Sequence, residues 1–258
     1  MKNKNCGNRF ANYIYKQMIN KRFTNATYLR LLLIVFVTAT LFSCNIFKRQ
    51  PKPSDFFTGT IVYNVEVKTS NLTTEAVKSK RDLLGTKMTL TVFENGDIQR
   101  VYDGSVNSGY EAEYINLNEN TILQKYKSND SIYTHSASTQ NMVKISDVRI
   151  PESTPVSVLD MTCKTQAIGV QEIEPSDKKR TYLTLFYSYN EAIRVDKFKY
   201  SKVNDDLWAY FMSENDGALF LKFVQDYSTH KVVYTAIKIE KGVYPTEAET
   251  TINLKLDK

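Results

Sequence analysis

The chain has 258 residues and a formal net charge of +6, and 42% of its residues are hydrophobic. The positive charge is confined to the first 43 residues, which carry seven of the 34 basic residues and none of the 28 acidic ones. The other 215 residues hold 27 basic and 28 acidic side chains and are close to neutral. This balance removes the main compositional argument for nucleic-acid binding, and the length is enough for one β domain with a full core.

An apolar run of twelve residues, Leu31–Phe42, follows basic residues only and ends at Ser43 and Cys44. The run is shorter than the roughly 20 residues that span a bilayer, and its length and ending are typical of a secretory signal. Leu41 and Ser43, at minus three and minus one, resemble the lipobox of bacterial lipoproteins. The resemblance implies cleavage between Ser43 and Cys44 and acylation of Cys44. The alternative is an uncleaved signal anchor with an ordinary cysteine.

Three segments are predicted along the chain. Residues 1–43 form the lipoprotein signal, although the stretch before the apolar run is long for a signal, so Met18 is an alternative start. Residues 44–56 contain two prolines and several charges, which favours a flexible tether. Residues 57–258 form a single antiparallel β domain.

The anchor implies a membrane as partner, because acyl chains on Cys44 would hold the domain at a bilayer. Asn45 follows the cysteine and the first charged residues after it, Lys48 and Arg49, are basic, so we expect the outer membrane, facing the periplasm. With Cys44 acylated, Cys163 is the only other cysteine of the processed chain, so we expect no intrachain disulfide.

Apolar and polar residues alternate with a period of two from residue 60 onward, which is typical of half-buried strands. A tight turn is expected at Glu94–Asp97, because Asn-Gly tolerates positive φ. The predicted strands lie at 60–68, 88–92, 98–102, 111–117, 121–127, 131–136, 158–170, 181–189, 218–227 and 231–241, with a last one around Ile252, Leu254 and Leu256. Short turns between them indicate an antiparallel sheet of consecutive neighbours.

Helix signals interrupt this pattern in two places. Asn71–Leu84 contains good helix formers followed by Gly85, which suits a helix end, and Gln140–Val148 is a candidate for a second short helix. Ile193–Ser213 fits helix and strand equally well. The predicted fold class is therefore mainly β, a curled antiparallel sheet or incomplete β-barrel with one or two helices across it.

The sequence contains no clear catalytic or metal-binding group. His135 and His230 lie near predicted strand ends without metal-ligand spacing, and we expect both to be exposed loop histidines. Cys163 shares the phase of Leu159 and Met161 on an apolar face, so we expect a buried thiol.

Carboxylates offer one further candidate, a calcium site. Asp205-Asp206 and Glu172 with Glu174 lack the spacing of a calcium loop, so a solvated surface is the expectation. We predict no enzyme activity and no cofactor.

Aromatic residues make up 12% of the chain and concentrate in the predicted strands. Core packing explains most of them. The alternatives are an apolar pocket for a hydrophobic ligand or a platform for sugars. The strand Thr181–Tyr189 is apolar on both sides, with Leu183 and Tyr187 on one and Tyr182 and Phe186 on the other, which predicts a cover on each face.

The order of the elements resembles two groups of envelope proteins. Phe57–Tyr63 opens the domain, Val158–Lys164 lies within the long meander, and Gly217–Leu221 precedes the strand Thr235–Gly242. This resembles the GLPGLI-type envelope proteins, without their Gly-Leu-Pro-Gly-Leu-Ile phrase, and more distantly the LolA/LolB-like lipoprotein carriers. The resemblance implies an incomplete barrel that shelters acyl chains, with the helix Asn71–Leu84 as the lid.

Three functions follow from these observations. The first is a non-catalytic, lipid-anchored envelope protein that binds or carries a hydrophobic ligand such as a lipid or acyl group. The alternative is a structural lipoprotein that presents its surface to an envelope protein partner. A glycan-binding module or an enzyme ranks lower, because a site needs mutually placed partners that the sequence lacks.

Overall fold

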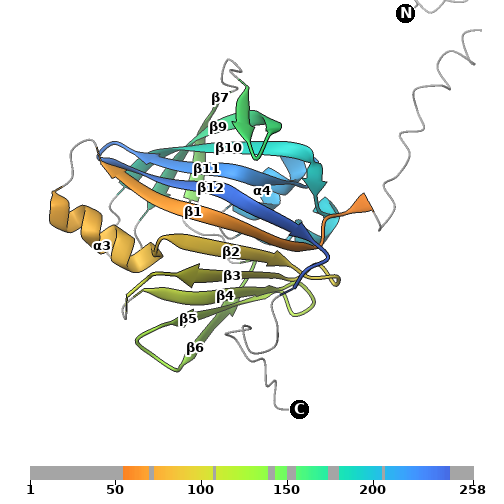
Figure 1. The fold of residues 1–258 in the computed structure, drawn as a ribbon, viewed down its shortest axis with the longest axis horizontal. Helices are drawn as coiled ribbons and strands as arrows, with labels where there is room; N and C mark the ends of the chain where they lie inside the picture. Colours follow the sequence, from red (N-terminus) through yellow and green to blue (C-terminus); the bar gives the residue numbers. More distant parts are fainter. Residues whose placement is uncertain are drawn as a thin grey trace, which may run out of the picture. The chain divides into compact units, whose positions relative to one another are not determined.

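The computed structural model describes residues 55–69, 73–106, 109–138, 143–149, 155–173, 180–204 and 207–244 (Figure 1). The chain divides into two units, Met1–Pro51 and Lys52–Lys258, and all described residues belong to the second. This unit contains the complete described sheet and its core, so we expect it to fold on its own. The predicted signal, Cys44 and most of the tether lie outside the described residues.

Within the described residues, twelve strands form the body of the domain. Their bounds are β1 Gly59–Thr69, β2 Lys87–Val92, β3 Ile98–Asp103, β4 Tyr110–Asn116, β5 Thr121–Tyr126, β6 Ile132–Ser136, β7 Val143–Arg149, β8 Val156–Val158, β9 Met161–Ile173, β10 Arg180–Arg194, β11 Ala218–Tyr227 and β12 His230–Lys241. Eleven of them follow the order β6-β5-β4-β3-β2-β1-β12-β11-β10-β9-β7, and β8 pairs with β9.

The sheet consists of two meanders joined through its first and last strands. Strands β1 to β6 are consecutive neighbours, as are β9 to β12, and β1 pairs with β12 along its whole length. Every described pairing is antiparallel. Strands β6 and β7 are the two edges, and no pairing joins them within the described segments. The predicted fold class, mainly β with a curled, incompletely closed antiparallel sheet and few helices, is confirmed.

One sequence prediction of local structure is wrong and another is wrong at one end. The segment Gln140–Val148, a candidate for a short helix, overlaps β7, which is an edge strand paired with β9. The expected strand 158–170 is β9 from Met161 onward, but its first three residues are the end of β8 and a hairpin turn at Leu159 and Asp160. Both turn residues have positive φ, of 50° and 60°, so the turn is of the mirror-image kind that suits a two-residue hairpin. The last predicted strand, around Ile252, lies outside the described residues.

Two α-helices and one 3₁₀ helix complete the described elements: α3 Thr74–Leu84, η2 Lys197–Tyr200 and α4 Trp208–Glu214. Helix α3 connects β1 and β2, as predicted. The ambiguous segment Ile193–Ser213 resolves into the end of β10, then η2, then most of α4. In Figure 1, α3 lies beside one end of the sheet, whereas α4 lies behind β11 and β12.

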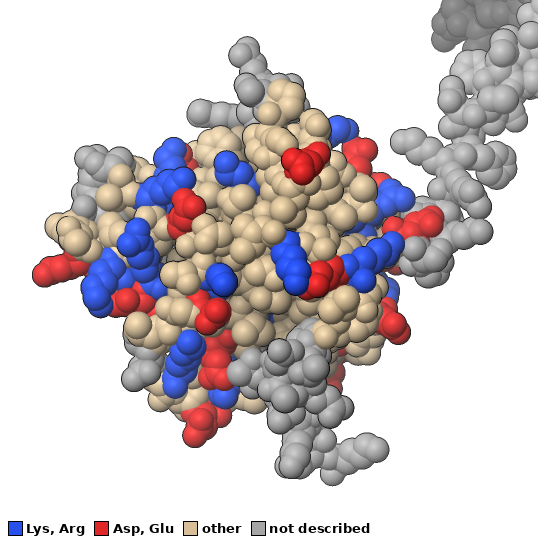
Figure 2. All heavy atoms as spheres, viewed as in Figure 1, with Lys and Arg blue, Asp and Glu red and all other residues tan. Residues whose placement is uncertain are grey.

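We define the inner face of the sheet by Tyr63, Leu90 and Tyr187, which are at most 3% exposed. Residues directly opposite each other on paired strands share a face of the sheet. The register of the pairings therefore identifies the inner-face residues of every strand from β9 to β5. The main core lies on the inner face and includes the buried residues Trp208, Phe211 and Met212 of α4. The opposite, outer face carries polar pairs such as Lys238 with Glu240. Figure 2 shows basic and acidic side chains interspersed there around a broad uncharged area.

Candidate functional site

Cys163 lies at the start of β9 and is 2% exposed, as expected from its phase. Its Sγ is 3.5 Å from the carbonyl oxygen of Met161, and burial raises the pKa of the thiol. A buried cysteine with a raised pKa is a poor nucleophile at neutral pH. Leu159, which was expected on the same buried face, is 40% exposed because it occupies the hairpin turn.

The expectation of two exposed loop histidines is wrong for His230. This residue opens β12 and is only 6% exposed. Its ring stacks on Tyr227 with a centroid distance of 4.5 Å, and its Nδ1 is 3.0 Å from Thr229 Oγ1. Burial, and then the nearby Lys80 of α3, lowers the pKa of His230. The expectation is wrong for His135 as well, because this residue lies on β6 and is partly buried.

The acidic candidates do not form a described metal site. Asp205, Asp206 and Glu174 lie outside the described residues, as does the side chain of Glu172. In the described segments no group of three or more His, Cys, Asp and Glu side chains is arranged to hold a metal ion. Nor is any described helix long and apolar enough to cross a membrane.

A cavity of about 60 Å³ lies on the inner face, between the sheet and α4. Its walls come from five strands, β2, β3, β10, β11 and β12, and from the helix, and they are mostly aromatic and apolar. The lining residues are Met88, Arg100, Tyr102, Tyr187, Trp208, Phe211, Met212, Phe220, Phe223, Gln225 and Tyr234. Only Phe223 and Gln225 among these are half-buried rather than buried, so the mouth of the cavity lies beside them on β11.

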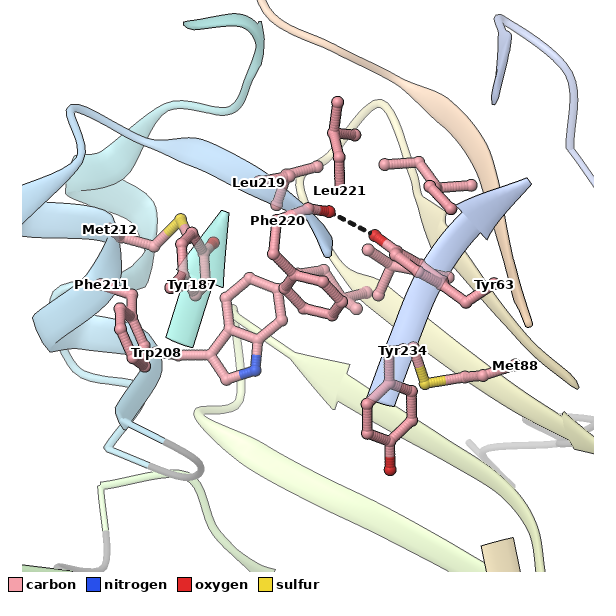
Figure 3. Packing of buried hydrophobic residues seen from close by; sticks show 14 of the residues in the cluster. Tyr63, Met88, Tyr187, Trp208, Phe211, Met212, Leu219, Phe220, Leu221 and Tyr234 are labelled. Atoms are coloured by element: carbon pink, nitrogen blue, oxygen red, sulfur yellow. Dashed lines mark hydrogen bonds between the residues drawn. The ribbon is translucent and has the colours of Figure 1, made fainter. Parts of the chain in front are cut away.

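The aromatic rings around the cavity pack on one another (Figure 3). Phe211 of α4 stacks on Tyr187 of β10 with a centroid distance of 4.3 Å and an interplanar angle of 14°. The ring centroid of Phe220 lies 4.9 Å from that of Tyr63 and 5.4 Å from that of Phe223. Side-chain packing of this kind holds α4 against the sheet, since aromatic pairs add about 0.5–1.5 kcal/mol each beyond their buried area.

Two tyrosine hydroxyls fix the start of β11 beside the cavity. Tyr63 donates to the carbonyl oxygen of Phe220 at 2.7 Å, and Tyr187 donates to that of Ala218 at 2.9 Å. Burial raises the pKa of both hydroxyls, so they remain protonated and act as donors. The cavity wall formed by β11 is therefore a rigid part of the sheet.

One charged residue, Arg100 of β3, is among the lining residues. Its Nη1 lies 2.7 Å from Glu113 Oε1 on β4, and both side chains are at most 7% exposed. Gln124 of β5 donates to the other oxygen of Glu113 at 3.0 Å. The guanidinium also lies over the Trp208 ring, 5.2 Å from its centroid. The apolar cavity therefore has one charged side chain in its wall.

Sequence analysis missed Arg100 and Glu113. Arg100 shares the phase of Ile98 and Tyr102, and Glu113 shares the phase of Ile115. The period of two therefore places both charged residues on the inner face. That alternation was the available signal, because a charge in an inward position of a strand is exceptional.

The helix that covers the cavity is α4 rather than the predicted lid. Helix α3 has no buried residue and contributes none to the cavity wall. Near the C-terminal end of α3, Val106 N donates a hydrogen bond to Asp82 O at 2.8 Å. The outer face of β10 also lacks the predicted cover at Tyr182, which is 61% exposed and accepts from Gln171 at 2.7 Å.

The outer face carries a smaller apolar cluster. Ala112, Tyr114 and Leu123 are buried there, with Phe93 and Val101 packed against them. After β12 the chain turns at Gly242, and Tyr244 stacks on Phe93 with a centroid distance of 6.0 Å. Open depressions of about 310 and 370 Å³ adjoin Tyr244.

Comparison with known proteins identifies no family. No protein-family model matches the chain, and no curated protein matches it. Among solved structures, LprF from Mycobacterium bovis matches 73% of this chain and 90% of its own chain, with 13% identity and a TM-score of 0.29. A TM-score of this size supports no conclusion about function, and the fold described above rests on this chain alone. Membership of the GLPGLI-type or LolA/LolB-like groups stays a prediction.

Proposed function

We propose that the domain is non-catalytic and binds a hydrophobic ligand, such as a lipid or acyl group, on its inner face. The observation that carries the proposal is the cavity under α4, which has apolar and aromatic walls and a mouth beside Phe223 and Gln225. Apolar cavities with a few polar groups are the common form of a ligand site. Each buried methylene contributes roughly 0.8 kcal/mol, so a long acyl chain would gain substantially from such a site.

The cavity of about 60 Å³ is smaller than the roughly 300–1,000 Å³ of sites that take whole ligands. A bound acyl chain therefore requires α4 to move away from the sheet. Helix α4 has seven residues and no side-chain N-cap. The chain that connects it to β11 passes through Gly217, whose φ is 81°. The three buried side chains of α4 are the main part of its attachment, so a ligand that replaces their contacts offsets the cost of the movement.

The anchor completes the proposal. Acylation of Cys44 would keep the domain at the outer membrane, facing the periplasm, as an acceptor or local binder of lipid rather than a soluble shuttle. Fatty-acid labelling of cells, comparing the natural chain with Cys44→Ala, tests the anchor. We expect label only on the natural chain, and an intact mass of the product that corresponds to an acylated residue 44. Equal label on both chains would contradict the anchor.

Ligand binding is tested on residues 52–258 with an apolar fluorophore such as N-phenyl-1-naphthylamine. Trp208, the single tryptophan of the chain, lies in the cavity wall, so bound fluorophore should change its emission. Gln225→Phe narrows the mouth and should weaken uptake by about tenfold or more, the effect of roughly 1.4 kcal/mol. The control is Lys222→Phe, on the same strand but outside the cavity wall, which should leave uptake unchanged. No uptake by the unmodified domain would refute the proposal.

A further inference from the structure

The outer face of the sheet contains a buried patch that has no role in the proposed function. We call it the outer-face patch, and its members are Phe93, Gln99, Val101, Ala112, Tyr114 and Leu123. Gln99 of β3 lies opposite Thr91 of β2 and Tyr114 of β4. Gln99 is 0% exposed and Thr91 is 1% exposed. The solvent side of an antiparallel sheet ordinarily carries exposed polar side chains, so this burial indicates a surface that packs against another segment.

The polar atoms of the patch indicate the chemistry of that segment. Among the described residues, neither amide atom of Gln99 has a hydrogen-bond partner, and Thr91 Oγ1 has none either. Each unpaired buried polar group costs about 1–3 kcal/mol. The amide of Gln99 has donors and an acceptor, and a peptide backbone offers both counterparts in every unit. An acyl chain offers neither, so the patch favours a peptide.

The chain itself brings a peptide to the patch. After β12 it turns at Gly242, and Tyr244 stacks on Phe93 with a centroid distance of 6.0 Å and an interplanar angle of 10°. Tyr244 belongs to the walls of both outer-face depressions, of about 310 and 370 Å³, and the first of these also contains Thr91 and Val101. The chain therefore reaches residue 244 inside the patch, with space on either side of the ring.

The remaining chain is long enough to cover the patch. Residues 245–258 follow Tyr244, and 14 extended residues reach about 45 Å at roughly 3.3 Å each. The distance from β1 to β5 is only about 19 Å at roughly 4.8 Å per strand. Attachment to the domain gives the segment a local concentration in the roughly millimolar range, which favours it over a free peptide.

The sequence of the segment matches the apolar part of the patch. Ile252, Leu254 and Leu256 alternate with Asn253 and Lys255. In an extended conformation the three apolar side chains lie on one side and the polar ones on the other. Burial of each apolar side chain contributes about 1.5–3 kcal/mol. An extended segment with this pattern can cover the patch and keep its polar side in water.

We propose that residues 245–258 dock on the outer-face patch of the same chain. Ile252, Leu254 and Leu256 pack on its apolar side chains, and the backbone of the segment hydrogen-bonds with the amide of Gln99. The docked segment closes the outer face, so the inner face is the one left open to a hydrophobic ligand. The inference goes beyond the proposed function and does not depend on it, because the two concern opposite faces of the sheet.

Hydrogen exchange of residues 52–258 at pH 7.5, read by mass spectrometry, tests the docking. In the unmodified domain, the amides of residues 251–256 should exchange about tenfold or more slower than in a free peptide of residues 245–258. Val101→Glu places a charge in the wall of the first depression and should bring exchange to within about threefold of the free peptide. Gln99→Leu removes the amide at similar size and should speed exchange about fivefold, the effect of one lost hydrogen bond.

The matched control is Val224→Glu on β11. Val224 is half-buried like Val101, and it lies on the outer face because it follows the inward-facing Phe223. It belongs to neither depression, so exchange of the segment should not change. Circular dichroism checks that each variant is folded, and if Val101→Glu is not, Gln99→Leu decides alone.

Three results would overturn the docking. The first is exchange in the unmodified domain as fast as in the free peptide, and the second is slow exchange that neither Val101→Glu nor Gln99→Leu alters. The third is protection that falls on dilution together with the mass of a dimer in sedimentation, which assigns the segment to a second copy. Fluorophore uptake by the same samples tests the proposed function separately. Uptake without protection overturns only the docking, and protection without uptake overturns only the proposed function.

Discussion

The two described α-helices of this domain are stabilised in opposite ways. Helix α3 has strong local signals: Thr73 caps its first turn, with Ala76 N donating to Thr73 Oγ1 at 3.2 Å, and Lys78 pairs with Asp82 one turn later at 2.7 Å. None of its residues is buried. Helix α4 has no side-chain cap and begins at Leu207 in the left-handed region, with φ of 61°, yet three of its seven residues are buried.

The difference shows which kind of stabilisation belongs to which function. Capping and surface pairs contribute roughly 1 kcal/mol or less each and act locally, so α3 relies more on local interactions than α4 does. Helix α4 depends on packing in the core, so anything that competes for the inner face acts on α4 first. The helix with the weaker local signals is therefore the one placed to respond to a ligand.

The largest expected effect comes from removing the packing of α4. Phe211→Ala deletes the ring that stacks on Tyr187 at 4.3 Å and should lower the free energy of unfolding by about 3–5 kcal/mol. Urea denaturation followed by circular dichroism measures the change. Phe198→Ala is the control, since Phe198 is 78% exposed, and should stay within about 0.5 kcal/mol. A loss below about 1 kcal/mol for Phe211→Ala would show that α4 is not fastened by its core contacts.

A smaller effect is expected at the cap of α3. Thr73→Ala removes the oxygen that accepts from Ala76 N and should cost about 1 kcal/mol of unfolding free energy. Thr73→Ser keeps a capping hydroxyl and should be nearly neutral. If the alanine and serine variants unfold at the same urea concentration, the cap does not stabilise α3. That result would contradict the local stabilisation of α3 on which the comparison with α4 depends.

The contrast between local and long-range stabilisation also explains which elements could be predicted from the sequence. Alternation in β2 to β5 and in β10 to β12 located those strands and their neighbours, because half-buried strands of a consecutive meander are set by the period of two. Helix α3 was also found from local signals, the good helix formers of Asn71–Leu84 and the Gly85 that follows them. Elements that depend on distant partners were missed or left ambiguous. Edge strand β7 depends on pairing with β9, and α4 on packing against β10 and β11.

Two features of the site show the same limit at single residues. Leu159 and Asp160 make a positive-φ hairpin turn without glycine or asparagine, so no turn signal marked the break between β8 and β9. Arg100 and Glu113 are inward by phase, but only the fold brings their side chains to 2.7 Å beside Trp208. The apolar character of the inner face was predictable, whereas the charged side chain in the cavity wall required the register of β3 and β4.

Acidification should weaken the contact region between α3 and the sheet. The pKa of His230 is lowered by burial and by Lys80 of α3, so the folded state favours the neutral ring. The unfolded chain takes up the proton near pH 6.5, so the contribution of His230 to stability is present above that pH and is lost as the pH falls below it.

Urea denaturation between pH 7.5 and 5.5 measures this decline, with His230→Gln as the reference for all other titrations. We expect a shallower decline in His230→Gln, and an intermediate one in Lys80→Met, which removes the secondary cause of the pKa shift. Identical slopes in all three proteins would contradict the assignment to His230.

The smallest effect is expected from the Lys78–Asp82 pair on α3. Lys78 is 74% exposed and Asp82 28% at the side chain, and an exposed pair one turn apart contributes about 0.3–0.5 kcal/mol. A double-mutant cycle with Lys78→Ala and Asp82→Ala, read by urea denaturation at low and high salt, isolates this coupling and should show it shrinking with salt. A coupling above about 1 kcal/mol, or one that salt does not change, would mean that Lys78 and Asp82 do not behave as a solvent-exposed ion pair.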